Sequence, residues 1–225
     1  MKIIIISDIH GSDNWKRVIP YKDQFDKIVV LGDEFDSWTN KWPNQMDNAL
    51  DLIKFKTLNS EKVDLCWSNH ATSYFLREQC SGFQPERFID IKEFYDKNQN
   101  LYDAIYIYDN WVFSHAGISK AWMKSCGIKN IRKINRLFRE RPNYFRWVGP
   151  NGYGDNDNEG PFWIRPISLL KNSIKKYHQC VGHTEGNDPR MLIQDKQIFV
   201  FADTKNHDYF VIIDTNTNNV EFVNL

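Results

Sequence analysis

Short runs of branched apolar residues, each followed directly by polar side chains, are the feature that most limits what this chain can fold into. Five runs stand out, at residues 3–6, 28–31, 63–67, 111–113 and 180–181. They are rich in Ile and Val and lack the alternation of apolar and polar residues that marks a strand with one solvent-exposed face. They therefore predict strands buried on both faces. Such strands belong in a layered fold.

Helix-like stretches separate the early runs, and hairpins follow later. The helices are expected at residues 12–19, 44–57, 71–79, 85–96, 131–138 and 166–177. Strand and helix alternate through the first hundred residues, which predicts an α/β layer fold. Hairpin turns are expected at Asp109-Asn110 and Asp195-Lys196, and a further pair of strands at 209–214 and 220–223. We therefore expect a mixed sheet whose last third is antiparallel.

The segment between Arg139 and Pro166 is rich in Gly, Asn, Pro and aromatic residues. Its many rings need burial, so it is expected to be a long ordered loop, and long loops in compact domains are often functional. Rings between Tyr144 and Trp163 could stack on a base or pack in the core. The chain shows no internal repeat, and its 225 residues predict one domain spanning 1–225.

Composition excludes several classes of protein. The formal net charge is zero, which argues against general nucleic-acid binding and against attraction to an anionic membrane. The four cysteines are scattered without a C-x-x-C pair, as expected for a reduced intracellular protein. The amino-terminal stretch MKIIIISDIH becomes acidic too early for a signal peptide, and no apolar stretch approaches the length of a membrane span. A soluble, cytoplasmic protein is expected.

Each of the five apolar runs ends in a polar cluster. These clusters read DIHG at 8–11, GDEFD at 32–36, SNH at 68–70, HAG at 115–117 and GHT at 182–184. Taken alone, Asp8 or Asp33 could cap a helix, a single histidine could be a packing residue, and Gly32 or Gly182 could serve a turn. Five such ends in succession favour a shared site, because sites assemble at the carboxyl ends of strands in open α/β sheets.

The donor types in these clusters suit two adjacent divalent cations. Carboxylate, imidazole and amide oxygen favour Mn, Fe or Zn over calcium cages or thiolate sites. Asp8 and His10 lie two residues apart, so both can turn toward one ion, and Asp33 would bridge the two. The second ion would be completed by Asn69, His115 and His183. Two divalent cations and two carboxylates together carry a net positive charge, which would attract a phosphate and a bridging hydroxide. This is the two-metal arrangement used for phosphoryl displacement.

In their order along the chain, DIH, GDEFD, NH, SHAG and GHT resemble the motifs of the calcineurin-like metallophosphoesterases. The resemblance is strongest to the branch that holds the phosphoprotein phosphatases and symmetrical dinucleoside tetraphosphatases. It implies an α/β fold with a central β-sandwich of mixed sheets flanked by helices, and the same metal ligands. It also implies that His70 protonates the leaving oxygen while Asp36 pairs with His70. Glu185 stands where the nuclease-like branch has a second histidine, which argues against that branch.

The chain departs from the family pattern at two motifs. Ser37-Trp38 follows Asp36 where phosphatases have Arg-Gly, so one phosphate-binding arginine is missing. Ser68 and Ala71 flank Asn69-His70 where Gly and Glu are usual. The segment FWIR at 162–165 is similar to a Trp-x-Arg segment of bacterial and phage-type phosphatases, and it makes Arg165 the candidate phosphate ligand. Arg146 is a weaker candidate, because an arginine among aromatic rings is commonly structural.

The sequence thus predicts a hydrolase of phosphomonoesters, with phosphoserine or phosphothreonine proteins as the expected substrates. The resemblance implies attack by a metal-bridging hydroxide, with Mn²⁺ as the expected ion and Fe, Zn or Ni as alternatives. Two other functions stay open. One is hydrolysis of dinucleoside polyphosphates or other nucleotide phosphoesters, and the other is phosphate binding without turnover.

Overall fold

Two mixed β-sheets form the centre of the computed structural model, which describes residues 1–149 and 156–224. The first sheet contains, in spatial order, β11 (Asn219–Asn224), β10 (Tyr209–Asp214), β1 (Lys2–Ile6), β2 (Lys27–Val30), β3 (Val63–Cys66) and β4 (Tyr102–Asp103). The second contains β5 (Ile105–Tyr108), β6 (Trp111–Ser114), β7 (His178–Val181), β9 (Gln197–Phe201) and β8 (Arg190–Gln194). Strands β1 to β4 are parallel, as are β6, β7 and β9, and the remaining pairs are antiparallel.

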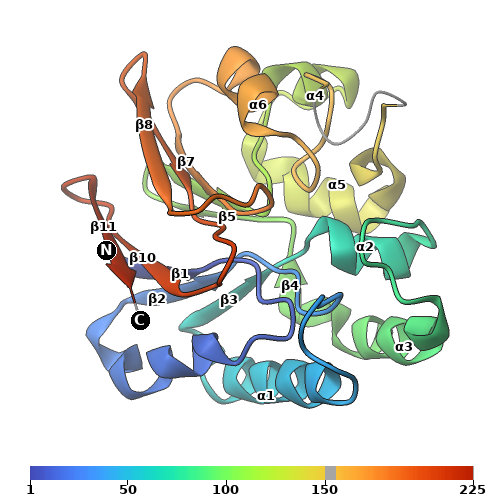
Figure 1. Ribbon diagram of the computed structural model, residues 1–225. Helices are drawn as coiled ribbons and strands as arrows, with labels where there is room; N and C mark the ends of the chain where they lie inside the picture. Colours follow the sequence, from blue (N-terminus) through green and yellow to red (C-terminus); the bar gives the residue numbers. More distant parts are fainter. Residues whose placement is uncertain (150–155, 225) are drawn as a thin grey trace.

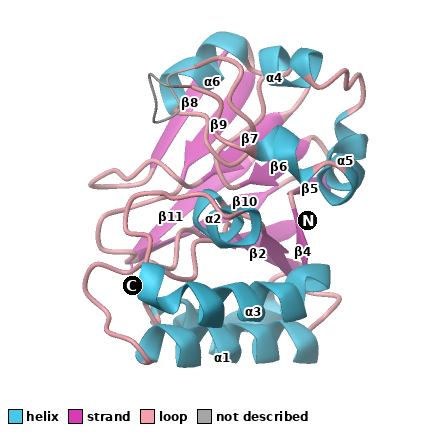
Figure 2. Cartoon of the chain, turned by 90° about the vertical axis from the view of Figure 1, so that its right-hand side faces the viewer, coloured by secondary structure: helices cyan, strands magenta, loops and turns pink. Residues whose placement is uncertain are grey.

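Helices cover the outer faces of the two sheets. They are α1 (Asn44–Leu58), α2 (Asn69–Leu76), α3 (Phe88–Asn98), α4 (Lys120–Ser125), α5 (Ile134–Glu140) and α6 (Pro166–Asn172). Short 3₁₀ segments are η1 (Asn14–Gln24), η2 (Pro85–Arg87), η3 (Gln99–Leu101), η4 (Ile131–Lys133) and η5 (Pro142–Phe145). Figure 2 shows α1 and α3 below the first sheet and α4 and α6 above the second. This is the expected β-sandwich of mixed sheets flanked by helices.

Strand β1 shows why these apolar runs do not alternate with polar residues. Ile3 and Ile5 face the space between the sheets, where they meet Trp111 of β6. Ile4 and Ile6 face the helices on the other side, and all four isoleucines are buried. Each such burial contributes roughly 1.5–3 kcal/mol to stability. The prediction of strands buried on both faces is therefore confirmed.

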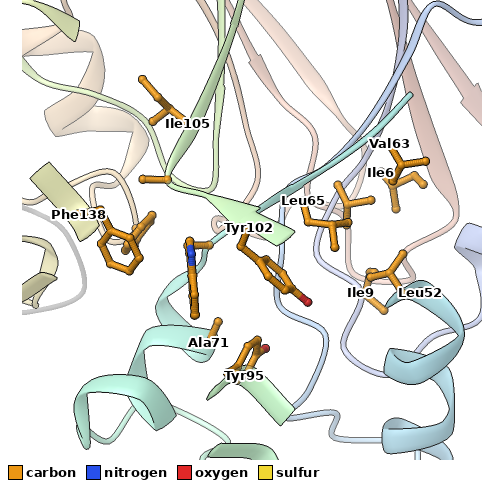
Figure 3. Close-up of a cluster of buried hydrophobic side chains, with 14 of the residues drawn as sticks. Ile6, Ile9, Leu52, Val63, Leu65, Ala71, Tyr95, Tyr102, Ile105 and Phe138 are labelled. Carbon is orange, nitrogen blue, oxygen red and sulfur yellow. The ribbon is translucent and has the colours of Figure 1, made fainter. Parts of the chain in front are cut away.

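The larger core lies between the first sheet and its helices and continues past β5 and β6 to α4 and α5. Figure 3 shows Leu52, Ala71 and Tyr95 from three helices gathered near Leu65 of β3 and Tyr102 of β4. The chain ends close to where it begins within this layer, because β10 pairs with β1 (Figure 1). No helix in the described part of the chain is long and apolar enough to cross a membrane.

The expected elements are largely confirmed, and the exceptions have local causes. The helix expected at 12–19 is wrong, because this stretch forms the 3₁₀ segment η1, with Pro20 inside it and no side-chain cap from Asp13. Helix α2 ends at Leu76, since Arg77 adopts a left-handed conformation with φ 57°. Helix α6 ends at Asn172, five residues before the expected end. The short elements α4 and β4 were not expected.

The segment 139–166 is described in part, and residues 150–155 of the expected loop lie outside the described residues. Phe145, Phe162 and Trp163 are buried in the core, and Phe145 and Phe162 contact Phe138 of α5. For these three rings core packing is confirmed. Trp147 differs, because its side chain is 44% exposed.

Candidate active site

The carboxylate of Asp33 lies at the centre of a cluster of imidazoles at the carboxyl ends of the strands. Its Oδ2 is 3.5 Å from His10 Nε2, 3.6 Å from His115 Nε2 and 3.8 Å from His70 Nε2. These separations exceed hydrogen-bond length. Asp33 Oδ1 is buried and has no hydrogen-bond partner among the described residues. A buried carboxylate surrounded in this way suits a cation between the donor atoms.

Asp8 joins the two sheets at this cluster. Its two carboxylate oxygens accept the backbone N–H of His183 at 2.9 and 3.2 Å, and Oδ1 is 3.8 Å from His115 Nδ1. Gly182 permits this approach, because a Cβ at that position would lie 2.0 Å from Asp8 Oδ2. Gly182 is thus more than a turn residue, and Asp8 caps no helix in the described structure.

Backbone carbonyls fix which nitrogen of each histidine faces the cluster. His10 Nδ1 lies 2.9 Å from the Phe35 carbonyl, and His115 Nδ1 lies 2.9 Å from the Leu31 carbonyl. A nitrogen that donates to a carbonyl carries the hydrogen, so Nε2 of each ring is left as a potential metal ligand. His183 Nε2 is 3.1 Å from the Trp163 carbonyl, which leaves its Nδ1, 3.2 Å from His115 Nε2, facing the cluster.

Asn69 is the first residue of α2, and its side chain is buried. Its Oδ1 has no hydrogen-bond partner within the described ranges. Ser68 caps the helix by accepting the Ala71 N–H at 3.2 Å, and the same hydroxyl accepts the Asp33 N–H at 3.2 Å. The residue that replaces the usual glycine therefore connects the second and third motifs.

His70 and Asp36 form a buried ion pair. His70 Nδ1 donates to Asp36 Oδ2 at 2.7 Å, and Asp36 is further held by the Tyr74 hydroxyl at 2.5 Å and by Gln84 Nε2 at 3.2 Å. Burial opposes the charge on His70, but Asp33 and Asp36 outweigh it and raise the pKa of the imidazole well above its usual value. The pair orients the imidazole, and Nε2 of His70 lies 3.8 Å from Asp33 Oδ2.

The pKa values of two other groups move in the direction that metal binding requires. Burial would raise the pKa of Asp33, but the imidazoles of His115, His70 and His10 lower it far below its usual value. Burial, together with the charges of His115 and Arg165, lowers the pKa of His183 well below its usual value. An ionised carboxylate and a neutral imidazole are the forms that bind divalent ions.

Several site residues have strained backbones. His10, Asp33, Asp36 and His183 have φ values of 41°, 57°, 63° and 65°, in the left-handed region that non-glycine residues rarely adopt. Each such residue costs of order 1 kcal/mol or more, and such strain clusters at functional sites. Four of the nine predicted site residues share this backbone conformation.

A cavity of about 510 Å³ opens onto this cluster. Seven of the nine predicted site residues line it: Asp8, His10, Asp33, Asn69, His70, Arg165 and His183. The other two, His115 and Asp36, lie directly behind, His115 beside Asp33 and His183 and Asp36 beside His70. The structure thus brings all nine together.

The two candidate arginines occupy different environments. Arg165 lines the cavity, where its Nη1 donates to the His183 carbonyl at 3.1 Å and to Thr184 Oγ1 at 3.3 Å. Arg146 instead binds Glu78 at 3.0 Å and the Leu76 carbonyl at 2.9 Å. Arg146 therefore has a structural role in these contacts, which agrees with the prediction that it is the weaker candidate for binding phosphate.

Some residues of the site were not expected from the sequence. Asp203, just after β9, lines the cavity with a buried Oδ1 that has no hydrogen-bond partner in the described structure. Burial and the nearby carboxylates of Asp8 and Asp33 raise its pKa well above the usual value. Trp38 and Trp147 also line the cavity. The only feature of the sequence that could have identified Asp203 as a site residue is its position just after an apolar run, which the predicted ligands share.

The residues present fit a dinuclear metal centre. Asp8, Asp33 and His115 bring donor atoms within 4.8 Å of one another. Asp33 also belongs to a second such group with His10 and His70, in which His70 is already bound to Asp36 and His10 is the predicted ligand. Two of the predicted ligands, Asp33 and Asn69, carry buried oxygens that the described protein leaves without partners. A shared carboxylate with nitrogen and oxygen donors on both sides suits a pair of divalent ions.

The family follows from a match over most of the chain. Residues 1–185 match the model of the calcineurin-like phosphoesterases, so the chain belongs to this family of metal-dependent phosphoesterases. No protein with a curated description of its function matches the chain in sequence.

Solved structures share the fold. The cold-active protein-tyrosine phosphatase of a psychrophilic Shewanella is 16% identical, with a TM-score of 0.65 over 98% of this chain and 80% of that one. A protein serine/threonine phosphatase from Saccharomyces cerevisiae is 12% identical, with a TM-score of 0.59 over 100% of this chain and 80% of that one. A metallophosphoesterase from Sphaerobacter thermophilus is 14% identical, with a TM-score of 0.54 over 100% and 88%. At these identities the similarity concerns the fold alone.

Proposed function

We propose that this protein is a dinuclear-metal phosphomonoesterase whose substrates are phosphorylated proteins, with phosphoserine and phosphothreonine as the expected residues. The observation that carries the proposal is the Asp33 carboxylate, which lies 3.5–3.8 Å from three imidazole nitrogens at the base of an open cavity. Two of the solved structures with this fold are named as protein phosphatases, which supports a phosphoprotein substrate.

The proposed ligands divide between two ions that share Asp33. Asp8 and His10 would hold the first ion, and Asn69, His115 and His183 would complete the second. Mn²⁺ is the expected ion, with Fe, Zn or Ni as alternatives, because carboxylate, imidazole and amide donors suit all four. When bound, such ions activate water for attack and neutralise the charge of the phosphate.

The protein's own residues orient the ester and manage the proton. Arg165, at the cavity wall, would bind a non-bridging phosphate oxygen. His70 would give the proton on Nε2 to the leaving alkoxide oxygen as the P–O bond breaks. Asp36 keeps His70 charged and oriented through the 2.7 Å hydrogen bond to Nδ1. His70 lines the cavity, as this role requires.

We also propose that residues 1–225 act as one metallophosphoesterase domain. The support is that β10, near the end of the chain, pairs with β1, whose carboxyl end supplies Asp8 and His10.

The proposal is tested by measuring hydrolysis by purified protein supplied separately with Mn²⁺, Fe²⁺, Ni²⁺ and Zn²⁺. The substrates are p-nitrophenyl phosphate, phosphoserine and phosphothreonine peptides, a dinucleoside tetraphosphate and a phosphodiester. We expect release of phosphate from the monoesters, strongest with Mn²⁺, and none after chelation. Preference for the dinucleotide would replace the phosphoprotein assignment, and phosphate binding without turnover with any of these ions would overturn the assignment as an enzyme.

A further inference from the structure

Two tryptophans stand apart from the other six in how they are exposed. Trp38 is 77% exposed and Trp147 is 44% exposed, whereas the others are buried or half-buried. Both exposed rings line the cavity that contains the candidate metal ligands. A large apolar ring in water is unfavourable, so two such rings at one polar cavity indicate a binding surface.

Each ring is attached to a well-supported part of the cavity wall. Trp38 lies two residues after Asp36, and its Cζ2 would be 3.3 Å from a Cβ on Gly82, so the ring lies against that loop. Trp147 directly follows Arg146, which is held by Glu78 and by the backbone of α2. Both rings therefore extend from segments of the cavity wall that other parts of the protein hold in place.

The cavity therefore joins two kinds of chemistry. Around Asp33 and Arg165 it is suited to a phosphoryl group, and at Trp38 and Trp147 it is suited to a flat apolar ring. Its volume of about 510 Å³ accommodates a ligand that has both parts. At this wall of the cavity the sequence departs from the phosphatase pattern, because Ser37-Trp38 replaces Arg-Gly. The chain therefore lacks one arginine that would bind phosphate and has an exposed aromatic ring beside that position.

We propose that Trp38 and Trp147 form an aromatic subsite that binds a planar ring of the substrate, so that the enzyme prefers ring-bearing phosphoesters to aliphatic ones. The inference rests on the proposed phosphoesterase function, and within it replaces phosphoserine and phosphothreonine as the preferred substrates with phosphoesters that carry a planar ring. Phosphotyrosine and nucleotides both provide a phosphate with a planar ring, and the experiment separates them.

The test uses two pairs of substrates. The first differs mainly in the ring, and the second differs also in its leaving group, phenolate against alkoxide, so its preference is judged by its loss in the tryptophan variants. One pair is adenosine 5′-monophosphate and ribose 5-phosphate, and the other is a phosphotyrosine peptide and the same peptide with phosphoserine. With Mn²⁺-loaded wild-type protein, we expect kcat/KM to favour the ring-bearing member by about tenfold or more, the size of a single stacking interaction. The pair whose preference is lost in the tryptophan variants identifies the source of the ring.

Variants at the two tryptophans test whether these rings are responsible. In Trp38→Ala and Trp147→Ala, we expect the preference to fall about tenfold through a higher KM for the ring-bearing substrate. Trp38→Phe and Trp147→Phe keep a ring and should keep most of the preference. Tyr21→Ala removes a ring that is 56% exposed outside this cavity and should change nothing. An equal loss for both members of a pair would show a structural role and overturn the subsite.

A binding measurement decides the inference independently of turnover. Dissociation constants are measured by calorimetry for the non-hydrolysable phosphonate analogues of phosphotyrosine and phosphoserine, with the metal-loaded protein. Tighter binding of the phosphotyrosine analogue, lost in Trp38→Ala and Trp147→Ala, supports the aromatic subsite even if no substrate is hydrolysed. Equal binding of the two analogues, together with no preference between adenosine monophosphate and ribose phosphate, refutes it while leaving the phosphoesterase assignment intact.

Discussion

At the scale of single residues, the sharpest question is whether His70 acts as an acid or as a metal ligand, because it lies near Asp33 as the ligands do. In the structure its Nδ1 is bound to Asp36, and its Nε2 is 3.8 Å from Asp33. If His70 is the acid, His70→Asn should lower kcat by roughly 10²–10⁴-fold, since general acid catalysis is worth that much. Its metal content, measured by elemental analysis, should stay near that of the wild type.

Asp36→Asn provides the second measurement at this site. It removes the negative partner but keeps a hydrogen-bond acceptor beside His70, so turnover should fall less than in His70→Asn. Tyr74→Phe removes only the hydroxyl that supports Asp36 and serves as the matched control, with a smaller effect still. Loss of bound metal in His70→Asn would show instead that His70 is a ligand.

The sequence predicted the residues of the site better than their surroundings. Asp8, Asp33 and Asn69 could be found because each follows an apolar run, and a strand end is a local property of the sequence. The sequence could identify Gly182 only as a possible turn residue. The need for glycine there arises because any Cβ would lie 2.0 Å from Asp8 Oδ2, and Asp8 is distant in sequence. The exposure of Trp38 likewise depends on the tertiary structure around it, and composition gives no sign of it.

At the scale of elements, the two-residue hairpin turns and the longer helices were predicted, and the short elements were not. Helix α1 has fifteen residues and a hairpin pairs neighbouring residues, so local pattern suffices for both. Strand β4 has only two residues, too few for a local pattern to predict. The 3₁₀ segment η1 replaces an expected helix, because it contains Pro20 and lacks a side-chain cap.

The pairing of β7 with β9 predicts a pH dependence of stability. His178 Nδ1 accepts the Ile198 N–H at 2.9 Å, and burial lowers the pKa of His178. Below the ordinary pKa of histidine, about 6.5, the unfolded chain therefore binds more protons than the folded chain. The stability that neutral His178 contributes is present above about pH 6.5 and is lost as pH falls. The slope from one proton is at most about 1.4 kcal/mol per pH unit.

His178→Gln tests this contribution, since a glutamine can accept the same hydrogen bond and does not titrate. Urea unfolding of both proteins, with a chelator present, is measured between pH 5 and pH 8. We expect the free energy of unfolding to fall less steeply toward low pH in the variant. Parallel curves over the whole range would show that His178 titrates alike in the folded and unfolded chains.

At the scale of the whole molecule, the candidate metal centre is assembled from both sheets. Asp8, Asp33 and Asn69 follow strands β1, β2 and β3 of the first sheet, and His115 and His183 follow β6 and β7 of the second. Ions bound between these donors would connect the two layers in addition to the apolar core. Metal binding should therefore stabilise the entire fold as well as permit catalysis.

This coupling can be measured by thermal unfolding with and without Mn²⁺. A ligand that binds only the folded state, at one hundred times its Kd, adds about 2.7 kcal/mol to stability, which for a chain of this size raises Tm by roughly 5–10 °C. Asp33→Asn removes the carboxylate shared by both ions and should abolish most of the rise. Asp47→Asn makes the same change of charge at an exposed position in α1 and should preserve the rise in Tm.

If Asp33→Asn responds to Mn²⁺ as the wild type does, the ions bind elsewhere. The reason is that no other carboxylate in the described structure lies within reach of His10, His70 and His115 together.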